Sequence, residues 1–96
     1  MNTGFEWDAA KNALNLAKHG ISLEDAQDIF AGPILVAEDT RREYGEVRKL
    51  AIGSLAGRIV IVVVYTEREG KLRLISARKA NRGERREYHD HLKKKA

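Results

Sequence analysis

Five side chains, from four separate stretches of the sequence, have the chemistry needed to act on a phosphate group. They are cations and proton carriers: Lys18, His19, Arg48, Tyr65 and Arg78. A guanidinium fork donates two hydrogen bonds to phosphate oxygens, and an imidazole gives or takes a proton near neutral pH. This set suits RNA cleavage without a metal, in which the ribose 2′-oxygen attacks the adjacent phosphate and fixed cations stabilise the developing charge. The residue types leave open which group is the general acid and which the general base.

Three of the candidates also have a structural interpretation. His19 stands where a predicted helix ends, and a cation is favourable at that end of the helix dipole. Arg48 can form an ion pair with Glu38 or Asp39. Tyr65 ends a long apolar run and can pack in the core. Sequence alone does not choose between these interpretations and the chemical one.

Metal, cofactor and thiolate chemistry are not indicated. The sequence has no cysteine, and its three histidines are His19, His89 and His91. The last two are two positions apart on a predicted helix, where they point to different faces. The HExxH zinc motif and the glycine-rich loops that bind nucleotides are absent. We therefore expect neither a metal nor a cofactor.

The composition is that of one globular domain with a highly charged surface. The 96 residues are 43% hydrophobic and 33% charged, which allows a single core. The opening residues, MNTGFEWD, lack the basic and apolar regions of a signal peptide. The longest apolar run, at residues 59–65, is far shorter than the roughly 20 residues that span a bilayer. We expect a cytoplasmic protein with a single domain over residues 1–96 and no membrane contact.

The net charge of +4 is concentrated near the C-terminus. Residues 1–77 carry ten Lys or Arg against eleven Asp or Glu, a balance of −1, and residues 78–96 carry eight against three, a balance of +5. A helix predicted over residues 82–92 places Arg82, Arg85 and Arg86 on one basic stripe. Such a stripe suits a polyanion or an acidic partner, although a solvated helix with a frayed tail at residues 93–96 also explains it.

The hydrophobic pattern predicts an α+β fold built on an antiparallel sheet of about four strands. The β-branched run at 59–65 is typical of a central strand, and a polar segment joins it to the next strand as a hairpin. The expected strands are 34–37, 47–52, 59–65 and 72–77, with a short edge strand at 5–7 and a turn at 53–57. On the strand 47–52, side-chain alternation places Arg48 on the same side as two apolar residues.

Two N-terminal helices are expected to cover one face of this sheet. Residues 9–18 are rich in helix formers, with Asp8 as N-cap and Gly20 as the left-handed closing residue. An apolar stripe at helical spacing is formed by Ala10, Ala13, Leu14 and Ala17. A second helix begins at Ser22 and ends before Gly32 and Pro33.

The motifs FEWD, NLAKHGIS, YGE, AIG, VVVYTER, ISARKA and ERREY follow one another over residues 5–88. In this order they resemble the BrnT family of toxins from bacterial type II toxin-antitoxin pairs. The resemblance implies a RelE-like sheet with helices, RNA cleavage that halts translation, and inhibition by a cognate BrnA-like antitoxin. It also implies that operator DNA is contacted only through the antitoxin, and that toxin and antitoxin can assemble as a dimer of heterodimers.

The five candidate residues fall on matched positions of these motifs. Lys18 and His19 match the family's K-H-G, and the other three match its strand arginine, its Y-T and its S-A-R. The resemblance implies that Arg48 and Arg78 are phosphate-binding cations. The chain departs from the family pattern at three positions that are not candidates: Leu23, Gly32 and Gly83.

Two other functions agree with the same residues. The chain can be a non-catalytic RNA- or antitoxin-binding module whose basic C-terminal helix does the binding, or an inactive toxin that acts as a co-repressor. Binding of RNA and binding of an acidic antitoxin both weaken as salt rises. Competition between the two ligands, rather than salt, would therefore assign Arg82, Arg85 and Arg86 to one of them.

Overall fold

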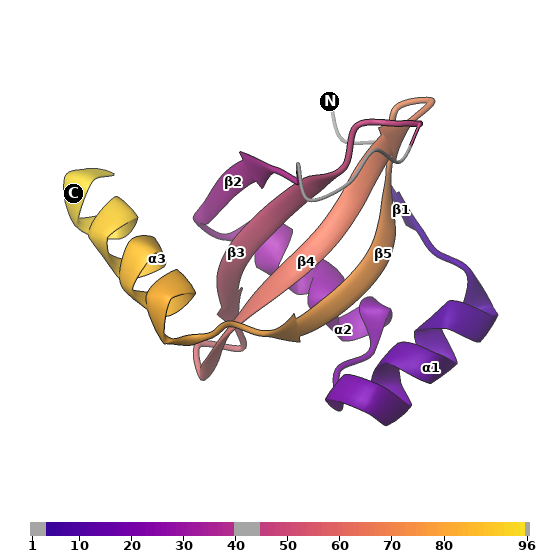
Figure 1. Ribbon diagram of the computed structural model, residues 1–96, viewed down its shortest axis with the longest axis horizontal. Helices are drawn as coiled ribbons and strands as arrows, with labels where there is room; N and C mark the ends of the chain where they lie inside the picture. Colours follow the sequence, from indigo (N-terminus) through magenta and orange to yellow (C-terminus); the bar gives the residue numbers. More distant parts are fainter. Residues whose placement is uncertain (1–3, 40–44, 96) are drawn as a thin grey trace.

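The computed structural model describes residues 4–39 and 45–95, which form an α+β fold as expected (Figure 1). The helices and strands of this part of the chain are β1 (Phe5–Glu6), α1 (Ala9–His19), α2 (Leu23–Ala26), the 3₁₀ helix η1 (Gln27–Ala31), β2 (Ile34–Glu38), β3 (Lys49–Leu55), β4 (Ile59–Arg68), β5 (Lys71–Lys79) and α3 (Arg82–Lys95). Of the residues expected to fray, 93–95 continue α3, and Ala96 lies outside the described residues.

The described strands form one mixed sheet in the order β1-β5-β4-β3-β2. β2 to β5 pair with their sequence neighbours in antiparallel fashion, as predicted. The expectation of about four antiparallel strands is corrected by β1, which pairs with β5 in parallel through Phe5 and Leu72. A parallel neighbour needs a long connection, and the helices and strands between β1 and β5 supply it.

One face of the sheet, called here the α2 face, carries the larger core. Ile61 and Val63 of β4 are fully buried there against Leu23 of α2 and Ile29 of η1. Figure 1 shows these two helices behind the strands. Gly53 was expected in a turn but lies inside β3, where an added Cβ would stand 2.9 Å from the Ile29 Cβ. The missing side chain therefore lets η1 pack closely on the sheet.

The opposite face, called here the α3 face, has a smaller core. Ile52 and Val62 are opposite each other on β3 and β4, and both pack against Tyr88 of α3. The Tyr88 ring is 2% exposed, and its hydroxyl donates to the Pro33 carbonyl at 3.0 Å. α3 therefore docks on the β2–β3 side of this face (Figure 1). Both faces of β4 are covered, as its unbroken apolar run predicted.

The caps predicted for the first helix are confirmed, and α3 has a cap of its own. Asp8 accepts a hydrogen bond from the Lys11 N–H at 3.0 Å, and Gly20 closes α1 with φ of 74°. At the start of α3, Asn81 and Glu84 each accept from the other's backbone N–H at 2.8 Å. This reciprocal pair is a capping box, so the start of α3 is fixed by its own sequence.

α1 packs on β5 through an amide side chain, and its apolar stripe faces solvent. Asn15 donates to the carbonyls of Ile21 and Ala77 at 2.8 and 2.9 Å, and it accepts from the Ala77 N–H at 3.1 Å. Asn15 is 7% exposed, whereas Leu14 of the apolar stripe is 70% exposed. The hydrophobic pattern of residues 9–18 predicted the helix but not the side that packs, because hydrogen bonds to β5 orient it.

Among the helices of the described residues, none combines the length and the apolar character that crossing a membrane would need.

Candidate active site

Three arginines lie side by side at one end of the α3 face. Thr66 of β4 is opposite Arg73 of β5, and the Thr66 hydroxyl donates to the Val47 carbonyl at 2.8 Å, which brings Arg48 to the other side of Thr66. Arg68 follows two residues after Thr66 on β4 and therefore points to the same face. We call Arg48, Arg68 and Arg73 the arginine row.

Two carboxylates hold the arginine row. Glu46 Oε1 lies 3.1 Å from Arg68 Nη2, and Glu46 Oε2 lies 3.8 Å from Arg48 Nε. Glu6 Oε2 lies 3.3 Å from Arg73 Nη1. The side chains of Arg48 and Arg73 are 25% and 31% exposed, so water and a ligand can reach them. A phosphate entering the row would compete with these carboxylates for the guanidinium groups.

A groove between α1 and β5 begins at the arginine row. One hollow of about 190 Å³ is lined by Asp8, Lys11, Glu46, Arg48, Arg68, Arg73, Leu74 and Ile75. A second hollow of about 230 Å³ is lined by Lys11, Leu14, Asn15, Lys18, His19, Ile75 and Ser76. The two hollows share Lys11 and Ile75 and are therefore adjacent, and we call the pair of them the α1–β5 groove.

The α1–β5 groove brings together residues that are distant in the sequence. Lys18 and His19, at the end of α1, lie beside Ser76 of β5. Arg73 is three residues from Ser76 along the same strand, a distance on the order of 10 Å. Lys18, His19 and Arg48 therefore line one groove. In the hollow that holds the arginine row, the Lys11 N–H lowers the pKa of the Asp8 carboxyl, so Asp8 adds a fixed negative charge there.

Tyr65 lies on the other side of the sheet. Its ring is 4% exposed in the core of the α2 face and meets the Phe30 ring edge to face, with centroids 5.2 Å apart. Burial, followed by the charge of Glu67, raises the pKa of the Tyr65 hydroxyl. Tyr65 points away from the arginine row and packs in the core, which is the structural interpretation of this residue in the sequence analysis.

Arg78 shares the α3 face with Arg48 but stands at its opposite end. Arg78 is opposite Val62, and Val62 is opposite Ile52, four residues along β3 from Arg48. The spacing of residues and strands puts Arg48 and Arg78 roughly 16 Å apart. Arg78 Nη1 and Nη2 bind the two carboxylate oxygens of Glu84 at 2.8 and 2.9 Å. The two arginines that the sequence singled out therefore share a face but not a pocket.

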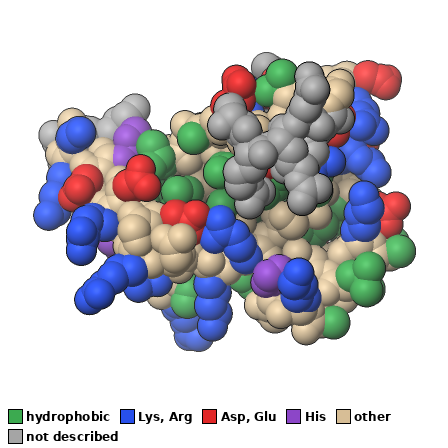
Figure 2. Space-filling model, viewed as in Figure 1, with side chains coloured by type: hydrophobic (Ala, Val, Ile, Leu, Met, Phe, Trp, Pro, Cys, Tyr) green, Lys and Arg blue, Asp and Glu red, His purple; other side chains and the backbone are tan. Residues whose placement is uncertain are grey.

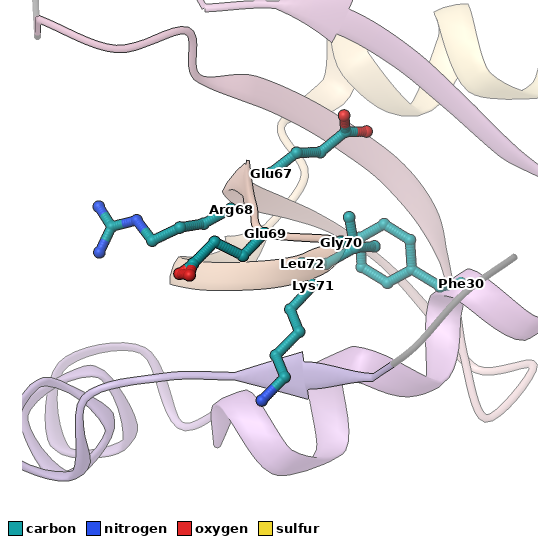
Figure 3. Close-up of a pocket in the computed structure, with 7 residues that line it drawn as sticks. All are labelled: Phe30, Glu67, Arg68, Glu69, Gly70, Lys71 and Leu72. Carbon is teal, nitrogen blue, oxygen red and sulfur yellow. The ribbon is translucent and has the colours of Figure 1, made fainter.

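A cavity of about 450 Å³ lies at the β4–β5 hairpin and gathers no reactive set (Figure 3). Phe30 lies against Leu72, and the charged side chains of Glu67, Arg68 and Lys71 point in different directions. Chemistry on one phosphate needs groups that converge. Size alone does not make this cavity the site.

Comparison with known proteins gives the identity of the family. A family model described as "Ribonuclease toxin, BrnT, of type II toxin-antitoxin system" matches residues 7–84. The chain belongs to the BrnT family. Membership implies an antitoxin partner, and it agrees with the resemblance carried by the sequence motifs. Comparison with curated proteins gives no match.

A solved structure supports the BrnT assignment. The chain is similar to the ribonuclease toxin BrnT of Brucella abortus, whose crystal structure is known, with 27% sequence identity and a TM-score of 0.62. The match covers 82% of this chain and 97% of the Brucella chain. The likeness therefore extends over nearly the whole of that toxin.

The basic residues of this BrnT-family chain that were predicted on the C-terminal helix lie where expected. Arg82, Arg85 and Arg86 are exposed on α3, and Arg85 Nη1 donates to the Ala80 carbonyl at 2.9 Å. Figure 2 shows Lys and Arg side chains around α3 and below the sheet. Among residues 4–39 and 45–95, no three His, Asp or Glu side chains gather as metal ligands.

Sequence reasoning missed Lys11, Arg68 and Arg73. Simple alternation back from Ala77, which is buried on the α2 face, would point Arg73 into the core. The register between β4 and β5 shifts at Val64 and Tyr65, and this β-bulge leaves Ile75 between Ser76 and Leu74 without a partner. The extra residue turns Arg73 to the α3 face. The signal that the sequence offered was Arg73 itself, a cation at a position where strand alternation predicts a core residue.

Proposed function

We propose that this chain is an endoribonuclease toxin that cleaves RNA in the α1–β5 groove without a metal. One observation carries the proposal: in a chain of the BrnT family, a single groove gathers two lysines, a histidine and the arginine row. Fixed cations are what a phosphorane needs, because its extra negative charge develops on the phosphate oxygens. The lysines and arginines that line the groove supply these cations, so the protein itself provides the positive charge.

In the proposed reaction, Arg48 and Arg73 bind the oxygens of the scissile phosphate in place of Glu46 and Glu6. The scissile nucleotide would lie where the two hollows adjoin, at Lys11 and Ile75, and His19 takes the proton of its ribose 2′-hydroxyl as the 2′-oxygen attacks phosphorus. The bond from phosphorus to the 5′-oxygen breaks, and the 5′-oxygen takes a proton from water. The products are a 2′,3′-cyclic phosphate and a 5′-hydroxyl. Lys18 holds the neighbouring phosphate.

The other two candidates have supporting roles in this proposal. Tyr65 keeps the Phe30 contact that packs η1 on the sheet, and Arg78 fixes the start of α3 through Glu84. Both act on the position of other groups rather than on the substrate.

Inhibition of translation and neutralisation by a cognate BrnA-like antitoxin complete the proposal. Membership of a type II toxin-antitoxin family supports both, and the sequence resemblance also implied a RelE-like fold. An antitoxin that covers the α1–β5 groove would block RNA directly. Operator DNA would then be reached only through the antitoxin, in an assembly that can pair two heterodimers.

A second candidate function is a non-catalytic RNA- or antitoxin-binding module, such as a co-repressor. The ion pairs of Arg48, Arg68 and Arg73 with Glu46 and Glu6 favour it, because a paired guanidinium has less capacity to stabilise a phosphorane. In that case the arginine row would hold the fold together, and RNA would bind without being cut.

Cleavage by the purified full-length chain distinguishes the two candidates. Single-stranded RNA is incubated with the protein in EDTA, and the product ends are identified by mass spectrometry. We expect 2′,3′-cyclic phosphate ends, and a rate about 100-fold lower in Arg73→Gln and in His19→Gln, the size of effect seen when one stabilising group is lost. Lys71→Gln, an exposed lysine outside the groove, is the matched control and should cleave normally.

Two results would refute the enzymatic proposal. One is RNA that binds the protein but stays intact in EDTA. The other is cleavage at the same rate in the Arg73→Gln variant and the Lys71→Gln control.

A further inference from the structure

A basic cavity lies at the other end of the molecule from the arginine row. It has a volume of about 340 Å³ and is bounded by the β3–β4 turn, the end of β5 and the first turns of α3. Four of its lining residues are basic: Arg58, Lys79, Arg85 and His89. Its floor is apolar, with Val60 and Tyr88, and no carboxylate is among the residues that line it. We call this hollow the basic cavity.

The cations of the basic cavity are not neutralised within the described part of the chain. None of Arg58, Lys79, Arg85 and His89 forms an ion pair with another residue of that part. The arginine row, in contrast, is held by Glu46 and Glu6. Positive groups crowded around one hollow without a carboxylate create a local field that attracts an anion.

Hydrogen bonds hold the backbone around the basic cavity in place. The Ala80 N–H donates to the Val60 carbonyl at 2.9 Å, and Arg85 Nη1 donates to the Ala80 carbonyl at 2.9 Å. The buried Tyr88 anchors α3 through its hydroxyl. A preformed site binds its ligand without first having to order these groups.

The position of the basic cavity favours a nucleic acid over an acidic peptide. Ser54 and Val60 of its lining are opposite each other on β3 and β4, and Val60 packs with Tyr88 on the α3 face. The arginine row and Arg78 lie on this same face. Cations repeated along one face suit a polymer that carries a charge on every unit, as a single-stranded RNA does.

We infer that the basic cavity binds phosphate groups of the RNA strand at a distance from the cut. This inference takes RNA as the ligand and so rests on the proposed function. It assigns a separate binding site, because the basic cavity shares no lining residue with the α1–β5 groove. RNA held at both ends of the α3 face would need several nucleotides on one side of the scissile phosphate.

The test measures binding without cleavage. A uridine 12-mer with 2′-O-methyl groups at every position cannot be cut, so its affinity for the full-length chain, read by fluorescence anisotropy, does not depend on the proposed chemistry. The variant is Arg58→Ser with Lys79→Ser. The matched control is Lys93→Ser with Lys94→Ser, which removes the same charge from exposed residues of α3 outside the cavity.

We expect the Arg58/Lys79 variant to bind the 12-mer about tenfold more weakly than the wild type. The slope of the logarithm of the binding constant against the logarithm of the salt concentration should become shallower by about 1.4, the value for two lost phosphate contacts on a single strand. The control should change affinity less than about twofold.

Equal weakening in both variants would overturn the inference. Unchanged RNA affinity would also overturn the inference. If the variant in addition bound purified antitoxin more weakly, the basic cavity would be reassigned to the antitoxin. If the wild type binds but does not cut native RNA, the proposed function fails while the basic cavity stands.

Discussion

At the scale of single residues, chemical type did not decide role. Arg48, Arg73 and Arg78 are all arginines on one face of the sheet, yet the first two line a groove and the third is clamped by Glu84. His19 lies in the α1–β5 groove, and Tyr65 lies on the opposite face. Which neighbours a side chain meets, rather than what it could do, separates these residues.

The pKa of Tyr65 predicts how stability depends on pH. Burial raises this pKa in the folded state, so the neutral phenol is the form that packs. The associated stability is fully present below the unfolded-state pKa of about 10 and is lost as pH rises above it. Urea unfolding from pH 8 to pH 11 should show a decline in the free energy of unfolding that is smaller in Tyr65→Phe.

The Tyr65→Phe variant also checks the role given to this residue. The ring stays against Phe30, so RNA cleavage should remain close to the wild-type rate. A parallel loss of stability in both proteins above pH 10 would contradict the pKa argument, and a large loss of cleavage would return Tyr65 to the active site.

At the scale of secondary-structure elements, polar contacts and a bulge decide how the parts meet. α1 is oriented by Asn15, and the bulge at Ile75 turns Arg73 out of the core and Leu74 into it. Neither effect appears in a count of apolar residues. The α1–β5 groove depends on both, because α1 carries His19 and β5 carries Arg73.

Substitution of the polar Asn15 should destabilise the protein more than substitution of the apolar Leu14. Asn15→Ala leaves the backbone groups of Ala77 and the Ile21 carbonyl without their buried partner, so we expect a loss of about 2–4 kcal/mol in the free energy of unfolding. Leu14→Ala, at a neighbouring exposed position, should stay within about 0.5 kcal/mol. Urea denaturation of both variants measures this. A larger effect at Leu14 than at Asn15 would mean that α1 packs through its apolar stripe.

At the scale of the whole molecule, α3 is both a carrier of charge and a part of the core. It brings the positive excess of residues 78–96 next to the sheet, and its Tyr88 and Leu92 pack with Ile52 and Val62. Removing α3 therefore removes binding residues and exposes core residues together. A truncation cannot by itself assign RNA binding to this helix.

Truncation after Ala80 should lower the stability of the protein, whereas removal of positive charge from an intact α3 should not. Loss of Tyr88 from its contacts predicts a decrease of about 3 kcal/mol or more, because a large buried side chain is deleted. The variant Arg82→Ser with Arg86→Ser keeps the helix and should change stability by less than about 0.5 kcal/mol. Thermal unfolding of both proteins checks this. Equal melting temperatures for the truncated and full-length chains would show that α3 is not part of the core.

The sequence by itself determined the local features: the helices with their caps, the β4–β5 hairpin, the apolar strand covered on both faces, and the motifs of the BrnT family. These depend on residues close together in the chain, whose backbone preferences and hydrogen bonds act over a few positions. Only the tertiary structure decided that Arg48 and Arg73 share one hollow, that His19 lines the adjacent hollow, and that Arg78 instead binds Glu84. It also decided that a cavity lined by four basic residues and no carboxylate forms beside α3. Strand register, one bulge and the docking of two helices set those distances, and no pattern of residue types contains them.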